Sequence, residues 1–198
     1  MESATHNYYP LLRTIENDRT VYEWWEELQD DKGGRANLRR CSSPVEATFQ
    51  PAYHRLISEL RRQGAVTALK DDPKLTIAAM AGLLAHIRTN TGVVPRRENT
   101  PENEKEANSP DSEPTGRGSR TFGQTLSGDA EVLSELRFRR LLQTDDQDTL
   151  YRTMIRVIRQ CNYSVPLLSF AATIVFWEED RTRQQLAFGY YDTPRKDA

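Results

Sequence analysis

The sequence predicts an all-α protein in which two small helical bundles are joined by a polar, disordered linker. Three observations support this fold class. Outside the linker, apolar residues recur at i, i+3, i+4 and i+7, which is the period of an amphipathic helix. Residues that commonly begin helices precede several of these runs. No segment shows the strict apolar–polar alternation of a half-buried strand.

The overall charge is nearly balanced, with 27 basic and 29 acidic residues and a formal net charge of −2. Such a chain cannot bind nucleic acid by excess charge, so a binding surface requires local segregation of basic residues. Cys41 and Cys161 lie far apart and the histidines are scattered, which indicates neither a zinc site nor a disulfide framework. We expect no metal, no cofactor and a reducing cytoplasm. No apolar run reaches the roughly 18 residues of a membrane span, so no membrane contact is expected.

We expect an N-terminal helical bundle over residues 1–94. Thr20 and Glu23 fit a capping box, which predicts a helix that begins at about residue 21. Trp24 and Trp25 then lie on the apolar side of this helix. Tryptophans in that position usually belong to the core, although they could stack on nucleic-acid bases.

Two further helix starts lie in the same bundle. Ser43 is followed by Pro44 and then by Glu46, a pattern that predicts a capped helix. Another helix begins near Pro73 and is apolar nearly all round, which is typical of the central helix of a bundle. His86 on this helix is interpreted as a tolerated or hydrogen-bonded residue, because no partner lies at the spacing of metal ligands.

A basic turn over residues 31–40 contains four cations and one acid. Arg35 and Arg39 lie at i and i+4 and so share one helix face, and Arg40 lies beside them. Guanidinium groups and the free N–H groups at a helix start both bind phosphate well. The candidate nucleic-acid-binding residues here are Lys32, Arg35, Arg39 and Arg40. The alternative is a solvated basic helix whose arginines pair with the acids just upstream, Glu26, Glu27, Asp30 and Asp31.

The segment 95–121 is predicted to be a linker or a long surface loop. Ala107 is the only apolar residue between Pro95 and Thr121, apart from prolines and glycines. Such a segment buries too little apolar surface to offset the entropy of ordering it. We therefore expect it to be dispensable for folding.

A second bundle is expected over residues 122–198. Helices are predicted over 134–142, from Asp146 or Asp148 to Cys161, and from about 164–166 through Trp177 into a charged turn at 178–183, after which apolar residues continue to Tyr191. Basic residues line faces of the first two helices at helical spacing. The candidate nucleic-acid-binding residues are Arg137 and Arg140 on the first, and Arg156 and Arg159, in a stripe with Arg152, on the second.

The sequence contains none of the common catalytic motifs. It lacks GxGxxG, a Walker loop, HExxH and GxSxG. The adjacent acids Glu178, Glu179 and Asp180 fan around a helix, and this arrangement seldom forms a metal site. We expect that the protein is not an enzyme.

The order of several short motifs resembles the CasB family, the small subunit of the type I-E CRISPR surveillance complex Cascade. The matching pieces are VYEWWEEL (21–28), GRANLRR (34–40), Ser43-Pro44, AGLLAH (81–86), FGQTL (122–126), SELRFRRLL (134–142), and the tail from Trp177 through RQQL (183–186) to Tyr190-Tyr191. Together they span most of the chain outside the linker. The linker departs from the family, because it looks longer and more polar than the usual connection.

The resemblance implies a non-catalytic helical subunit that holds the target strand and the displaced strand of the R-loop. The implied partners are the large subunit and the backbone subunits of Cascade, a second copy of the chain, guide RNA and target DNA. The motif match implies that five arginines bind nucleic acid: Arg35, Arg39, Arg40, Arg137 and Arg140. Arg156 and Arg159 are proposed mainly because they lie in the basic stripe of their helix. Two alternatives remain: a protein–protein adaptor whose arginines meet acidic surfaces, and a free-standing DNA- or RNA-binding regulator.

Overall fold

The computed structural model describes residues 12, 14–63, 73–95, 120–127 and 132–192, and in these ranges it confirms the predicted all-α fold. Nearly all of the predicted linker, residues 96–119, lies outside the described residues. The prediction that this linker is disordered is therefore untested, and so are the proposed domain boundaries.

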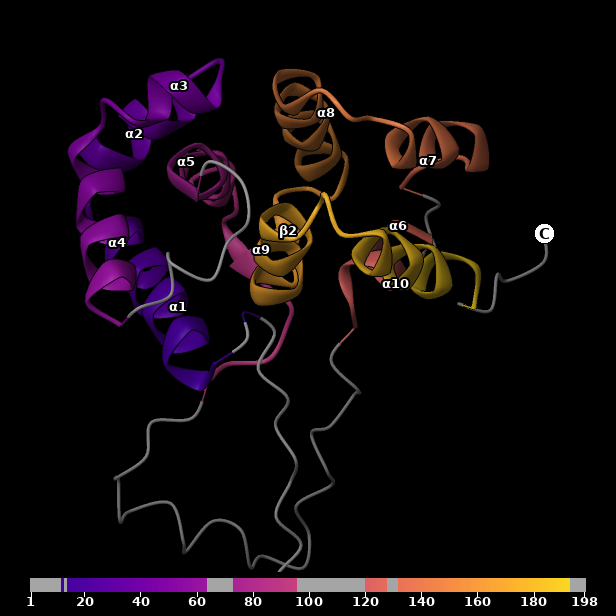
Figure 1. Cartoon of the computed structure of the whole chain (residues 1–198), viewed down its shortest axis with the longest axis horizontal. Coiled ribbons are helices and arrows are strands. Elements are labelled where there is room, and N and C mark those ends of the chain that lie inside the picture. Colours follow the sequence, from indigo (N-terminus) through magenta and orange to yellow (C-terminus); the bar gives the residue numbers. More distant parts are fainter. Residues whose placement is uncertain (1–11, 13, 64–72, 96–119, 128–131, 193–198) are drawn as a thin grey trace, which may run out of the picture.

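The helices are arranged around α5, and two short strands join the halves of the chain (Figure 1). The N-terminal half contains α1 (Ile15–Asp30), α2 (Lys32–Arg40), α3 (Pro44–Ala47), α4 (Pro51–Arg62), α5 (Pro73–Leu84) and strand β1 (Thr89–Asn90). The C-terminal half contains α6 (Phe122–Ser127), α7 (Glu135–Leu142), α8 (Gln147–Gln160), strand β2 (Ser164–Val165), α9 (Leu167–Val175) and α10 (Asp180–Tyr191).

The first helix begins earlier than the sequence predicts. Thr14 is its N-cap, and its hydroxyl oxygen accepts a hydrogen bond from the Asn17 N–H at 3.1 Å. The Asp18 carboxylate accepts from the Leu12 N–H at 2.7 Å, which fixes the chain before this first turn. Thr20 is buried inside the helix. The prediction of a cap at Thr20 is therefore wrong, because Thr14 already caps the free N–H groups one and a half turns earlier.

Two other predicted helix starts are confirmed. The Ser43 hydroxyl accepts a hydrogen bond from the Glu46 N–H at 3.3 Å, and Pro44 occupies the first turn. Of the two aspartates considered for α8, Asp146 is the cap, since its carboxylate accepts from the Thr149 N–H at 2.7 Å. Local sequence therefore determines where these helices begin.

The two tryptophans of α1 are core residues, as predicted. Trp24 and Trp25 are only 5% and 6% exposed. Their indole N–H groups donate to the Ala52 carbonyl at 3.0 Å and to the Ile87 carbonyl at 3.4 Å, respectively. Each ring is thus packed and hydrogen-bonded, the usual arrangement for a buried tryptophan.

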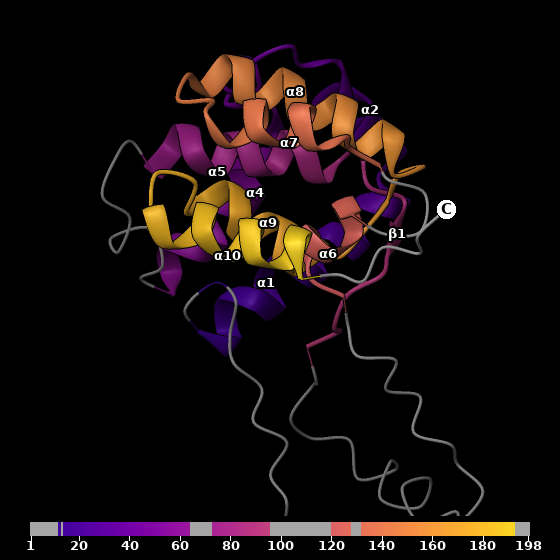
Figure 2. The ribbon, with the colours of Figure 1, turned by 90° about the vertical axis from the view of Figure 1, so that its right-hand side faces the viewer.

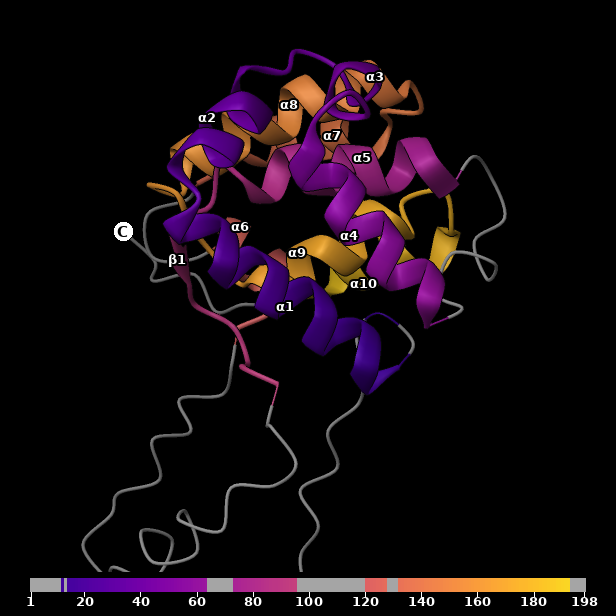
Figure 3. The same cartoon turned by 90° about the vertical axis from the view of Figure 1, so that its left-hand side faces the viewer.

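Helix α5 is the centre of the fold, as its all-round apolar sequence predicts. Helices α1, α2 and α4 lie on one side of it (Figures 1 and 3), and α8 and α9 pack on the other. The buried side chains of both halves form one contiguous cluster. The two halves of the chain therefore pack against each other in its described part.

A parallel pair of two-residue strands also connects the halves. Thr89 pairs with Ser164, and Asn90 pairs with Val165. The Asn90 side-chain oxygen accepts from the Leu167 N–H at 2.9 Å, which adds a contact to the start of α9. The sequence did not predict these strands, because two residues are too few to show alternation.

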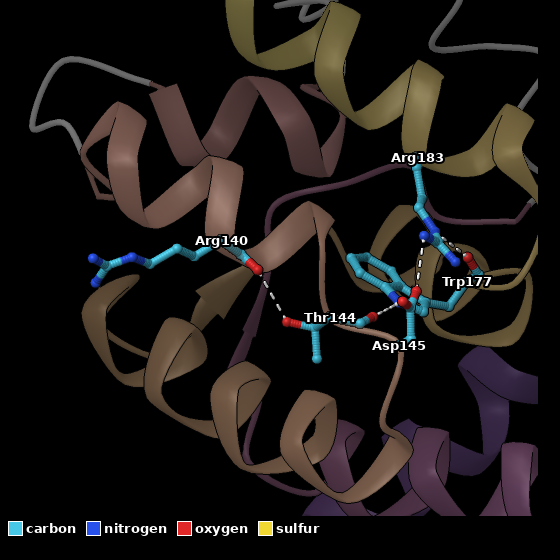
Figure 4. A network of polar contacts seen from close by, with 5 residues as sticks. All are labelled: Arg140, Thr144, Asp145, Trp177 and Arg183. Carbon is cyan, nitrogen blue, oxygen red and sulfur yellow. Dashed lines mark hydrogen bonds and ion pairs between the residues drawn. The ribbon is translucent and has the colours of Figure 1, made fainter.

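The chain turns between α9 and α10, close to the predicted charged turn, although α10 already begins at Asp180, inside the range predicted for that turn (Figure 4). The Trp177 indole N–H donates to the Thr144 carbonyl at 2.8 Å. Arg183 donates to the Trp177 carbonyl at 3.1 Å and to Asp145 at 3.1 Å. These contacts fix the turn on the connection between α7 and α8, which a continuous helix could not reach.

Candidate nucleic-acid interface

The start of α2 is held by Asp31, which orients the arginines that follow. The Asp31 carboxylate accepts a hydrogen bond from the Gly34 N–H at 2.8 Å and pairs with Arg55 at 2.7 Å. Both contacts lower the pKa of Asp31, the hydrogen bond from Gly34 most. A Cβ at Gly34 would collide with this carboxylate, so a larger residue there would shift the Asp31 side chain from its present position. Leu38 is fully buried and anchors the other side of the helix.

Arg35 binds the carboxyl end of α5. Its Nε donates to the Ala85 carbonyl and one terminal nitrogen donates to the Ile87 carbonyl, both at 3.0 Å. Burial, together with the charges of Arg39 and Arg88, lowers the pKa of Arg35. A cation that satisfies the last carbonyls of a helix stabilises it without any ligand. Arg35 is therefore a structural residue, and its predicted contact with nucleic acid remains a prediction.

Three arginines lie within electrostatic reach of one buried histidine, and a fourth lies near one of them. His86 is 3% exposed, and its Nε2 has no hydrogen-bond partner among the described residues. Burial lowers the pKa of His86 to about 4, with further contributions from the charges of Arg39, Arg159 and Arg35. Arg88 lies within electrostatic reach of Arg35 in turn. We refer to Arg35, Arg39, Arg88 and Arg159 as the His86 basic cluster.

This cluster brings together two predicted groups that are far apart in the sequence. Arg39 comes from α2 and Arg159 from the end of α8, and both are exposed. The Tyr151 hydroxyl on α8 donates to the Cys41 carbonyl at 3.4 Å, which holds α8 against the end of α2. The end of the basic stripe of α8 therefore lies near the basic turn, where Arg159 and Arg39 both act on His86.

The charges of this surface are not neutralised by neighbouring acids. Among the described residues, neither Arg39 nor Arg159 forms an ion pair, and Asp31 pairs with Arg55 on α4 instead. The alternative in which the acids upstream of α2 pair with its arginines is thus not found in the described part of the chain. Like charges held close together repel one another, and an anion placed between them relieves that repulsion.

The other candidate residues divide between this surface and a second one. Lys32 and Arg40 are exposed on α2, and Arg156 is exposed on α8. Arg137 and Arg140 are exposed on α7, which lies on the far side of α8 from α2 (Figures 1 and 2). The side chain of Arg140 points away from its neighbours, and only its backbone carbonyl takes part in the network of Figure 4.

Arg88 is the member of the cluster that sequence analysis missed. Its guanidinium carbon lies 4.5 Å from the centroid of the Tyr163 ring. The N–H groups of Arg88 and Thr89 both donate to the Tyr163 carbonyl, at 2.9 and 3.2 Å. A cation directly after Ile87, a buried apolar residue just beyond α5, was the available signal, but no local pattern links it to Tyr163.

The described residues offer little to catalysis or metal binding. Burial raises the pKa of both thiols, that of Cys161 to about 11, so neither is a ready nucleophile at neutral pH. No group of three or more potential metal ligands occurs in the described ranges. None of the helices described there combines the length and the apolar character needed to cross a membrane.

The fold and this surface define a helical protein with an unpaired basic face and, in its described part, no recognisable catalytic or metal centre. The model of one family, CRISPR-associated protein Cse2, matches residues 34–191. Because this match covers more than half of the chain, the protein belongs to the Cse2 family, and the resemblance to CasB is confirmed. Cse2 is the structural, non-catalytic small subunit of type I-E Cascade. Searches of curated proteins and of solved structures find no match.

Proposed function

We propose that this Cascade subunit binds nucleic-acid backbone through the His86 basic cluster and thereby stabilises the target and displaced strands of the R-loop. The observation that carries the proposal is that Arg39 and Arg159, on helices far apart in the sequence, both lie near His86. Both side chains are exposed, and neither forms an ion pair among the described residues. Lys32, Arg40 and Arg156 extend this surface along α2 and α8. Arg137 and Arg140 supply a second contact on α7.

The physical character of the surface suits contact with the backbone rather than with base edges. In an RNA-guided complex, pairing with the guide RNA selects the sequence, so the protein needs to hold only phosphates and unpaired strands. Arginines hold phosphates without regard to sequence, and the binding depends on salt because condensed counterions are released. Arg35 contributes by fixing α2 on α5, which keeps Arg39 in place beside Arg159.

The partners follow from the same assignment. We propose that the chain assembles with the large subunit, the backbone subunits and a second copy of itself, and that guide RNA and target DNA lie beside it. A second candidate is an adaptor without direct nucleic-acid contact. Exposed apolar side chains on and just after α3 favour this candidate, since Val45 is 50% and Phe49 is 72% exposed.

Salt dependence separates the two candidates. The complex is assembled with Arg39→Ala or Arg159→Ala, and its affinity for target DNA is measured over a range of salt concentrations. Each substitution should flatten the slope of log affinity against log salt by about 0.7 to 0.9, the value for one lost phosphate contact. Arg61→Ala, which removes an exposed arginine from the end of α4, is the matched control and should leave the slope unchanged. Unchanged slopes in fully assembled complexes of both variants would favour the adaptor.

A further inference from the structure

The pair formed by Arg88 and Tyr163 has the form of a stacking platform. The guanidinium carbon lies 4.5 Å from the ring centroid, so the cation is held over the face of the ring. Arg88 is exposed and Tyr163 is half-buried. The Tyr163 ring therefore lies against the guanidinium group, while Arg88 as a whole remains exposed to solvent.

The backbone beneath this platform is strained but well supported. Asn162 and Tyr163 have φ angles of 52° and 61°, a left-handed conformation that asparagine tolerates and that a tyrosine rarely adopts. The Tyr163 N–H donates to the Ile158 carbonyl at 2.9 Å, and its carbonyl accepts two hydrogen bonds from Arg88 and Thr89. These contacts hold the tyrosine beneath Arg88 before any ligand arrives.

The platform adjoins the phosphate-binding surface. Arg88 lies within electrostatic reach of Arg35. The Asn162 N–H donates to the Arg159 carbonyl at 3.0 Å, so the strained turn begins where the arginine stripe of α8 ends. A strand whose phosphates contact Arg39 and Arg159 would therefore pass beside Arg88.

We propose that Arg88, supported by Tyr163, stacks on an unpaired base of the strand that the His86 basic cluster holds. The inference rests on the proposed function and adds a preference for single-stranded nucleic acid over duplex. Inside a duplex both faces of each base are covered by neighbouring bases, whereas an unpaired base can stack on an arginine plane or an aromatic ring. Every base has such a face, so the contact does not select a sequence.

The test compares two oligonucleotides of equal length and equal phosphate number, oligodeoxythymidine and its abasic counterpart. The full-length chain should bind the first more tightly at low salt, by about 5- to 150-fold for one stacked base. A duplex that contains the oligodeoxythymidine strand should bind more weakly than the free strand. Arg88→Lys keeps the charge but removes the planar guanidinium group. It should therefore reduce the ratio of the two affinities toward one and leave the slope of log affinity against log salt unchanged.

Two further variants complete the test. Tyr163→Leu should reduce the same ratio, and if it does not fold, Arg88→Lys alone decides. Arg39→Ala is the matched control, because it should flatten the salt slope and keep the ratio. Equal, salt-dependent binding of both oligonucleotides by the native chain would overturn the platform and leave the proposed function standing. Salt-independent binding, or no binding, of both would overturn the two proposals together.

Discussion

Replacing Arg35 by alanine tests whether this residue of the basic turn acts on the fold or on a ligand. The guanidinium makes two charged hydrogen bonds, to the Ala85 and Ile87 carbonyls. A hydrogen bond that involves a charged group typically contributes about 1.5–3 kcal/mol. Arg35 is only partly buried, so water replaces part of this loss, and Ile87 keeps its bond from Trp25. We expect Arg35→Ala to lower the free energy of unfolding by about 2–4 kcal/mol.

The assay is urea unfolding of the full-length chain, together with its thermal midpoint. A loss of this size corresponds to about 5–15 °C in a chain of this length. Arg35→Lys keeps the charge but cannot bridge both carbonyls, so it should recover only part of the stability. Arg39→Ala should leave both midpoints unchanged, because exposed charges contribute little to folding. A native midpoint in Arg35→Ala, combined with a flattened salt slope, would refute the structural role.

Three further predictions concern the core and the linker. The pKa of His86 is lowered from 6.5 to about 4, so the unfolded chain binds more protons than the folded one between these values. The free energy of unfolding should therefore fall on acidification, and His86 should account for about 2 kcal/mol of this loss at pH 5. His86→Leu should remove the part of the pH dependence that comes from this group. The measurement is the urea midpoint at pH values between 7 and 5. Trp24→Ala should lower the free energy of unfolding, measured in urea, by about 3–5 kcal/mol. A variant that keeps its stability and loses only nucleic-acid affinity would contradict the assignment of Trp24 to the core. Replacing residues 95–121 by a short Gly/Ser linker should leave the thermal midpoint unchanged, whereas a fall of many degrees would show that the segment packs.

Local patterns predicted the helical elements well. The cap at Ser43, the tryptophans of α1 and the central position of α5 all follow from residues close together in the chain. Local signals also misled where two competed: Thr20 fits a capping box, but Thr14 caps the helix first. The contacts that fix the turn between α9 and α10 could not be predicted, because Trp177 reaches Thr144, which is 33 residues away.

The candidate site was predicted as clusters of exposed arginines, and the sequence could not show which of these clusters lie together. Helical spacing identified Arg39 and Arg159 individually, but α2 and α8 both pack against α5, and this places both arginines near His86. The structural role of Arg35 depends on a contact across 50 residues, which no local period contains. Arg88 was missed for the same reason, since its partner Tyr163 comes from the other half of the chain.

Photo-cross-linking from Arg159 tests the central claim most directly. A photoreactive amino acid replaces Arg159 in the chain, which is then assembled with its partners, loaded with guide RNA and bound to target DNA. The account predicts cross-links to nucleic acid at this position, and none when the same amino acid replaces Arg61. Cross-links from position 159 to protein subunits alone would contradict it.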